Sequence, residues 1–175
     1  MSMTLQSSYT LVPGTWLLGT VDSGDPLIVA AKNANASASI PIGFPVAYKP
    51  SGGTSDIDAT TPVASDKIMG ISVRSDSQGR AWTDENGSHG EMDSTGVLVG
   101  VLFPVLKRGR VFVTCTDGCV PGKPLFVAVQ SQGAYTAAGQ MGTVTATNAI
   151  DCTAFGQWVT TASAGGGAWL EVNFV

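Results

Sequence analysis

The sequence predicts an all-β protein, a single-domain β-sandwich or jelly-roll-like barrel with long surface loops. Most apolar segments are short, rich in Val, Ile, Thr and aromatic residues, and bounded by Gly, Pro, Asn, Asp or Ser. This is the pattern of strands joined by turns. No window longer than about ten residues holds apolar residues at helical spacing without Gly or Pro. In addition, one arrangement of turn, strand, loop and Gly-containing strand occurs twice.

The repeated arrangement begins with a Gly-x-Pro turn directly ahead of an apolar run. The first copy is residues 40–48 (IPIGFPVAY), followed after a polar loop by KIMGISVR from Lys67. The second copy is residues 119–129 (CVPGKPLFVAV), followed by AFGQWVTT from Ala154. Gly tolerates positive φ, and Pro fixes φ and lacks an N–H. Each Gly-x-Pro therefore indicates a turn and the start of a strand rather than a catalytic loop.

The expected strands cover most of the chain. In order, they lie at residues 15–21, 26–32, 44–49, 67–74, 96–103, 105–107, 110–115, 125–130, 142–147, 155–162 and 168–175. The last one, AWLEVNFV, alternates between two faces. One face carries Trp169, Glu171, Asn173 and Val175, and the other carries Leu170, Val172 and Phe174. Since successive side chains of a strand point to opposite faces, one face of this strand can be buried while the other stays exposed.

The length of 175 residues fits one domain with its own core. Residues 1–12 have weak patterning and are expected to form an extended arm ahead of a single all-β domain at residues 13–175. Residues 75–95 contain few strand formers and form a long loop or an insertion. Loops longer than about 12–15 residues are usually functional or disordered. Trp82 in this segment either anchors the loop by burial or meets a partner. Residues 50–62, with Asp56 and Asp58, are interpreted as an ordinary solvated loop.

Charged residues make up only 13% of the chain, against about 25% in an average soluble domain. Association desolvates few charges in such a chain, which suits packing against copies of itself or a larger assembly. The net charge is −4 and no basic stripe is present, so nucleic acid is not an expected partner. No apolar run approaches the ~18 residues of a membrane span. The N-terminal sequence also lacks signal-peptide features, and synthesis in a cytosol is expected.

The nine Lys and Arg residues are scattered along the chain except for one cluster of three, Lys107, Arg108 and Arg110, within FPVLKRGRVFV. The simplest interpretation is a solvated hairpin turn at Gly109 between two strands. The alternative is a contact with a phosphate or a partner. Arg108 and Arg110, together with Trp82, are therefore the candidate partner-contact residues.

The cysteines and the single histidine do not indicate a catalytic, metal or cofactor site. Cys115, Cys119 and Cys152 are an odd number, which fits reduced thiols better than a disulfide framework. Zinc would need four ligands, and only Cys152 and His89 remain to join the Cys115/Cys119 pair, so the CTDGC segment is interpreted as the end of a hairpin. His89 lies in turn sequence, a poor place to hold catalytic geometry. The sequence thus predicts a protein that is not an enzyme.

Five segments, taken in their order along the chain, resemble the small head cement or decoration proteins of tailed bacteriophages. They are IPIGFPVAY, DKIMGISVRSD, FPVLKRGRVFV, VPGKPLFVAV and FGQWVTTASAGGGAWLEVNF. The similarity runs over roughly residues 40–174. The resemblance implies a β-rich protein without catalytic residues, made in the host cytoplasm and located on the outer surface of the virion. Its implied partners are the major capsid protein and further copies of itself, as a homodimer or homotrimer that bridges neighbouring capsomers.

Two other classes of protein remain as alternatives. One is a carbohydrate- or receptor-binding β-sandwich module of a phage tail fibre, for which Trp82 with Asp84 and Glu85 would be the contact region. The other is a small hydrolase, which could hardly lack His89.

Overall fold

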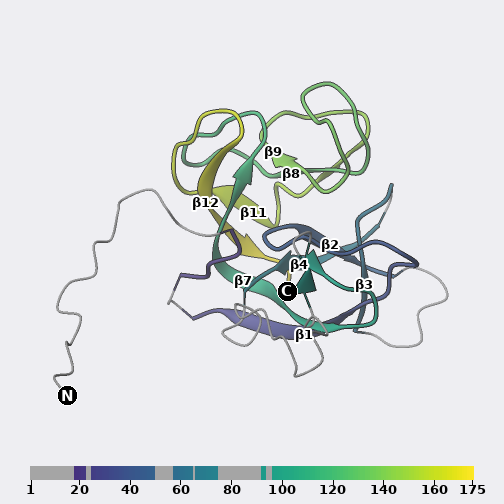
Figure 1. Ribbon diagram of the computed structural model, residues 1–175. Helices are drawn as coiled ribbons and strands as arrows, with labels where there is room; N and C mark the ends of the chain where they lie inside the picture. Colours follow the sequence, from purple (N-terminus) through teal and green to yellow (C-terminus); the bar gives the residue numbers. More distant parts are fainter. Residues whose placement is uncertain (1–17, 23–24, 50–56, 65, 75–91, 94–95) are drawn as a thin grey trace, which may run out of the picture.

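The computed structural model describes residues 18–22, 25–49, 57–64, 66–74, 92–93 and 96–175. These residues form strands and turns without any helix (Figure 1). The strands are β1 (Leu27–Asn33), β2 (Pro45–Tyr48), β3 (Asp58–Thr60), β4 (Ile68–Ser72), β5 (Met92–Asp93), β6 (Gly96–Val97), β7 (Leu102–Cys115), β8 (Phe126–Ala128), β9 (Met141–Gly142), β10 (Ala149–Asp151), β11 (Gly156–Trp158) and β12 (Gly166–Asn173). The all-β prediction is confirmed.

Five strands close into a small barrel. In the main sheet β1 pairs with β3, β3 with β2, β2 with β4 and β4 with β7, and β7 pairs back to β1. Only the β1–β3 pair is parallel. A closed ring has no exposed sheet edge, which removes the site where strands of other chains could add. The same sheet continues beyond the barrel through β12 and β11, while β8, β9 and β10 form a separate sheet.

β7 joins the barrel to the rest of the molecule (Figure 1). Its first half pairs with β1 and β4, and its second half pairs with β12. The predicted hairpin turn at Gly109 is wrong, because the strand runs without interruption from residue 102 to 115. Gly109 instead has φ 132°, and a Cβ there would lie 3.3 Å from the Cα of Pro26. Glycine lets the strand bend at this close approach without leaving the ladder.

The bend at Gly109 exchanges the two faces of β7. Phe103 and Val105 point into the barrel, whereas Val111 and Val113 belong to a second core. The barrel core consists of Ala31, Ile40, Ile42, Val46, Ala59, Met69, Val97, Phe103 and Val105. The second core contains, among others, Leu106, Val111, Val113, Cys115, Leu125, Val127, Trp158, Leu170 and Val172. One strand therefore supplies side chains to both cores.

The first copy of the repeated arrangement is confirmed around Gly43. This glycine has φ 79°, and its N–H donates to the Ser72 carbonyl at 2.8 Å. The Ser72 N–H donates back to the Phe44 carbonyl at 2.8 Å. Three residues before the glycine, Ile40 and Val97 exchange two backbone hydrogen bonds. The Gly-x-Pro turn therefore ties the start of β2 to the end of β4.

The second copy has the same hydrogen bonds around Gly122. This glycine has φ 81°, and its N–H donates to the Trp158 carbonyl at 2.8 Å. The Trp158 N–H donates back to the Lys123 carbonyl at 3.1 Å. Three residues before the glycine, Cys119 and Ala162 exchange two backbone hydrogen bonds. The similarity of the two segments in sequence thus corresponds to the same local structure.

Other expectations need correction. Residues 50–62 are not simply a solvated loop, because β3 lies within them and Asp58 is only 5% exposed. Residues 149–151 form β10, a strand that the sequence did not predict. Within the expected first strand at 15–21, the described residues form a turn and an isolated bridge at Val21. The expected arm at 1–12 and most of 75–95 lie outside the described residues.

Candidate functional site

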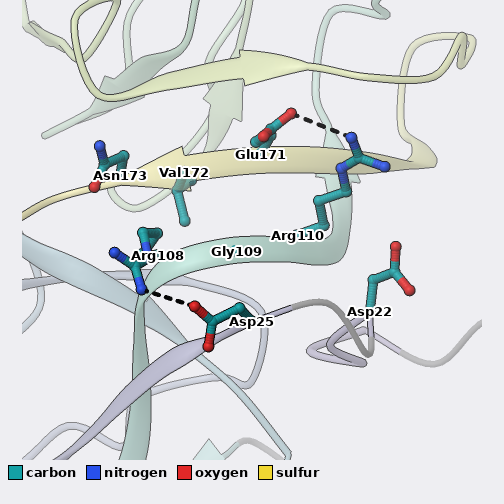
Figure 2. A pocket seen from close by; sticks show the side chains of 8 residues that line it. All are labelled: Asp22, Asp25, Arg108, Gly109, Arg110, Glu171, Val172 and Asn173. Carbon is teal, nitrogen blue, oxygen red and sulfur yellow. Dashed lines mark hydrogen bonds and ion pairs between the residues drawn. The ribbon is translucent and has the colours of Figure 1, made fainter.

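A groove of about 410 Å³ lies at the bend of β7 (Figure 2). Three parts of the chain form it: the residues around Gly109, the end of β12, and the segment that leads into β1. The lining residues are Asp22, Asp25, Arg108, Gly109, Arg110, Glu171, Val172 and Asn173. The groove therefore brings together segments that lie far apart in the sequence.

The bend of β7 positions the two arginines. Arg108 and Arg110 lie on either side of Gly109 and both are exposed. β12 runs along one edge of this part of β7, with Val172 opposite Gly109. On the other edge, the Asp22 N–H donates to the Arg110 carbonyl at 3.0 Å. The guanidinium groups are consequently carried by a strand that is paired on both sides.

Each arginine forms an ion pair across the groove (Figure 2). Arg108 Nη2 lies 3.2 Å from Asp25 Oδ2, and Arg110 Nη2 lies 3.6 Å from Glu171 Oε2. The side chains of the two arginines are 49% and 48% exposed, and that of Asp25 is 96% exposed. Exposed pairs of this kind contribute about 0–1 kcal/mol each. Both guanidiniums can therefore exchange their present carboxylates for those of a partner at little cost.

An aromatic pair continues the surface beyond the arginines. Phe112 of β7 faces Trp169 of β12 directly, with ring centroids 5.6 Å apart at an angle of 67°. Both side chains are half-buried. Phe112 lies against Gly167, where a Cβ would approach its ring to 2.4 Å. The absence of a side chain at Gly167 thus makes room for a fixed, edge-to-face aromatic pair beside the Arg110–Glu171 pair.

These features define one surface, called here the β7–β12 face: the charged groove together with Phe112 and Trp169. Partly exposed tryptophan and arginine are the residue types most enriched among the energetic centres of protein interfaces. The groove holds three carboxylates and two guanidiniums, so its charge is mixed rather than basic. The arrangement places charges of both signs beside apolar area, as protein–protein interfaces do.

Arg108 and Arg110 are the predicted contact residues that the structure brings together. Lys107, the third member of the predicted cluster, lies elsewhere, with its Nζ 5.6 Å from the centre of the Tyr48 ring. Trp82, the remaining predicted contact residue, lies outside the described residues. The sequence did not identify Phe112.

The alternation predicted for the last strand is confirmed. Leu170, Val172 and Phe174 are buried, whereas Trp169 and Glu171 are only partly buried. This alternation was the available signal for part of the β7–β12 face. The alternation could not indicate that Glu171 lies opposite Arg110, because the sequence of one strand does not predict which distant strand pairs with it.

The three cysteines are buried and free. Burial raises the pKa of Cys115 and Cys119, and it raises the pKa of Cys152 to about 12. A thiol that stays protonated at neutral pH is a weak nucleophile and a poor metal ligand. Among the described residues, no group of three or more His, Cys, Asp and Glu side chains is placed to hold a metal ion.

Within the same residues, no helix has the length and apolar character to cross a membrane.

Comparison with known proteins gives two findings. The family model described as "Structural cement protein (E217 gp24/Pam3 gp6)" matches residues 5–173. A solved structure titled "The capsid of Myoviridae Phage XM1" contains a chain with a similar fold. That similarity has a TM-score of 0.62 at 17% sequence identity, and it covers 99% of this chain and 100% of the other. No curated protein sequence matches the chain.

Proposed function

The chain belongs to the phage structural cement protein family, and from this premise we propose that it binds the outer surface of an assembled capsid and stabilises it. The main support is the extent of the family match, which runs over residues 5–173 and so includes both cores and the β7–β12 face. The partner in this proposal is the major capsid protein, together with further copies of the chain. The protein acts without catalysis and without a cofactor.

The stabilising mechanism is one of mass action. A protein that binds the assembled shell, and not its separated subunits, stabilises the shell by its own binding free energy. A copy that contacts two neighbouring capsomers makes its second contact at a high effective concentration, so that two weak contacts give firm attachment. Many copies on one particle add their effects.

The β7–β12 face supports this proposal as the contact with the capsid. Its arginines can exchange their present carboxylates for those of the capsid at little cost in free energy. Its aromatic pair offers apolar area that a partner would desolvate. Trp82 is a further proposed contact. Residues 1–12 are proposed as an arm that adds to a strand of a neighbouring subunit. Deletion of residues 1–12 with unchanged retention on capsids would remove the arm from the proposal.

The direct test is to incubate the purified protein with undecorated heads of its parent virus, sediment the heads and measure the copies bound per major capsid subunit. We expect saturable binding and a higher temperature of head rupture. The double variant Arg108→Gln/Arg110→Gln is expected to bind about tenfold more weakly at low salt, since the two interfacial charges are lost. Lys123→Gln, a similar change at an exposed lysine outside the face, is the matched control and is expected to bind like the wild type.

Two results would contradict the proposal in different ways. Absence of binding by the wild type would remove the capsid role and favour the tail-fibre module. Normal binding by the double arginine variant would leave the capsid role in place but exclude the charged groove as the contact.

A further inference from the structure

A smaller pocket, of about 230 Å³, lies between the start of β4 and the chain that runs from β10 to β11. The residues that follow β12 complete it, and in Figure 1 the C-terminus is drawn beside β4. The cavity is called here the Phe155 pocket. Its apolar lining residues are Ile68, Ile150, Cys152, Phe155, Phe174 and Val175.

The walls of the Phe155 pocket are fixed by contacts within the chain. The rings of Phe155 and Phe174 are stacked, with centroids 5.8 Å apart and an angle of 23° between their planes. The Phe155 carbonyl accepts a hydrogen bond from the Asn173 N–H at 2.7 Å, and the Phe155 N–H donates to the Cys152 carbonyl at 2.8 Å. A partner would therefore enter a pocket that is already formed, without first ordering its walls.

The size of the pocket indicates what it can hold. Pockets that enclose a whole small-molecule ligand usually measure about 300–1,000 Å³, and this one is smaller. Its mouth is apolar, because Phe155 is 44% exposed and Val175 is 76% exposed. A cavity of this kind fits one large apolar side chain of a protein partner, the type of anchor that dominates the energetics of many interfaces.

Two ammonium groups lie at one end of the Phe155 pocket. Lys67 lines the pocket, and its Nζ lies 5.8 Å from the centre of the Tyr48 ring. The Nζ of Lys107 lies 5.6 Å from the same ring centre. Within the described part of the chain, the ion pairs involve the two arginines of the groove and neither of these lysines. Because contacts between a cation and a ring are weak at exposed sites, both ammoniums can turn to a carboxylate of a partner.

The two carboxylates that line the pocket are engaged with their own neighbours. Asp66 Oδ2 accepts a hydrogen bond from the Val63 N–H at 2.9 Å, and Asp151 Oδ1 accepts one from the Thr153 N–H at 2.8 Å. They hold adjacent turns, whereas the lysine ammoniums each offer three donors beside an aromatic ring. Charge complementarity therefore favours an occupant with an acidic group next to its apolar anchor.

The Phe155 pocket and the charged groove lie on opposite faces of the β7–β12 ladder. Asn173 lines the groove, and the next residue, Phe174, lines the pocket. In β7, Arg108 lines the groove, whereas the preceding residue, Lys107, lies over Tyr48. Successive residues of a strand point to opposite faces. The two surfaces therefore face different neighbours, as a protein that bridges two subunits requires.

We propose that the Phe155 pocket binds a segment of the capsid in which a large apolar residue lies next to acidic residues. The apolar side chain fills the pocket, and the neighbouring carboxylates meet Lys67 and Lys107. The inference rests on the proposed function, to which it adds a second contact and the chemistry of the partner. Binding at the β7–β12 face raises the effective concentration of the second contact.

The first test uses short peptides with blocked ends as probes of the isolated protein. Acetyl-Glu-Leu-Glu-amide is titrated and followed by NMR, and the backbone amide signals of Lys67, Phe155 and Phe174 are expected to shift. Acetyl-Glu-Ala-Glu-amide lacks the anchor, and acetyl-Lys-Leu-Lys-amide reverses the charge. Each of these two peptides is expected to bind about tenfold more weakly.

The second test reverses the charge on the protein. Lys67→Glu/Lys107→Glu is expected to prefer the Lys-flanked peptide to the Glu-flanked one, which a merely structural role of the lysines would not produce. Lys123→Glu is the matched control, since Lys123 is an exposed lysine outside the pocket, and it is expected to keep the wild-type preference. Thermal unfolding of each variant checks that the fold is retained.

The third test measures retention on undecorated heads. Lys67→Gln/Lys107→Gln and Phe155→Ser are each expected to weaken retention about tenfold. Val144→Ser is the control for the loss of an exposed apolar side chain, because Val144 is 49% exposed and does not line the pocket.

The inference is overturned if none of the peptides shifts the pocket signals, or if the wild type binds the Lys-flanked peptide as tightly as the Glu-flanked one. Normal retention of both pocket variants on heads also overturns it, while leaving the capsid role in place. Failure of the proposed function has a different result: the wild type would select the Glu-flanked peptide and yet not sediment with heads.

Discussion

The two copies of the repeated Gly-x-Pro arrangement, called here the first and second units, share the same local hydrogen bonds but lie in different sheet environments. In the first unit, β2 pairs with β4 over several residues and helps to close the barrel. In the second unit, pairing with β11 is limited to the bridge between Pro124 and Gln157, and the following strand, β8, joins β9 and β10 instead. The comparison teaches that a local sequence pattern determines a turn, whereas the residues that pack around the turn determine the sheet.

The connection after each strand accounts for this difference. After β2 the chain returns as β3 and completes the barrel. After β8 the chain contributes β9 and β10, and Asp117 holds the connection in place. Its carboxylate accepts hydrogen bonds from the Thr143 N–H at 2.9 Å, the Thr143 hydroxyl at 3.1 Å and the Val144 N–H at 2.7 Å. The Asp117 carboxylate thus holds the segment that follows β9 against the end of β7, while pairing of β8 with β9 and β10 forms the second sheet.

Substitution is expected to affect stability most differently in the two units at the position two residues after the glycine of the Gly-containing strand. Trp158 is 1% exposed in the second core, and Ser72 occupies the matching position in the first unit. Trp158→Ala is expected to lower the free energy of unfolding by about 4 kcal/mol through cavity formation. Ser72→Ala removes a hydroxyl that donates to the Pro41 carbonyl at 2.6 Å and accepts a hydrogen bond from the Phe44 N–H at 3.0 Å. This change is expected to cost about 2 kcal/mol. Urea unfolding measures both, and a larger loss for Ser72→Ala would contradict the comparison.

The glycines within the two Gly-containing strands are expected to give the second largest difference in stability on substitution. A Cβ on Gly70 would lie 2.3 Å from the backbone oxygen of Leu106, whereas a Cβ on Gly156 would meet a terminal methyl of Leu125 at 2.7 Å. A methyl group can move aside and a paired backbone cannot. Gly70→Ala is expected to cost about 3 kcal/mol and Gly156→Ala about 1 kcal/mol. Equal midpoints of thermal unfolding for the two variants would show that β4 and β7 can separate freely.

A smaller effect is expected at the turn glycines. Gly43 and Gly122 have nearly the same φ, so alanine adds a similar strain of about 1 kcal/mol at each. A Cβ on Gly43 would also lie 3.2 Å from the Gly19 nitrogen and the Leu18 Cβ, whereas nothing lies within 4 Å of one on Gly122. Gly43→Ala should therefore unfold at a lower denaturant concentration than Gly122→Ala. If Gly122→Ala were the less stable variant, packing would not be the cause of the difference.

The smallest effect near neutral pH concerns the cysteines, all of which lie in the second core. Burial raises the pKa of Cys152 from 9.0 to about 12, so the folded state keeps a proton that the unfolded state releases. Stability should therefore be unaffected by this group below about pH 9 and should fall as the pH rises from 9 toward 12. Unfolding at pH 8 to 11 measures the slope. Cys152→Ala should have a shallower slope, and an unchanged slope would exclude this thiol as its source.

Much of the fold followed from local patterns. The alternation in residues 168–175 put Leu170 and Val172 on one face of the strand, which the structure buries, and the two Gly-x-Pro segments formed the expected turns. Both predictions depend on residues within a few positions of each other. Asp58 was placed wrongly for the opposite reason, because the strand that buries it, β3, has only three residues and pairs with β1 and β2.

By itself, the sequence determined that the protein is all-β, which residues share a face in the last strand, and that one turn–strand unit occurs twice. Only the tertiary structure decided that Gly109 bends a continuous strand rather than ending one, and that Arg108 meets Asp25, 83 residues away. The physical reason is that turn and alternation signals arise from φ/ψ preferences and side-chain direction within one segment. The contacts that build the groove and the barrel depend instead on which distant strands pair, and on the cores that hold them together.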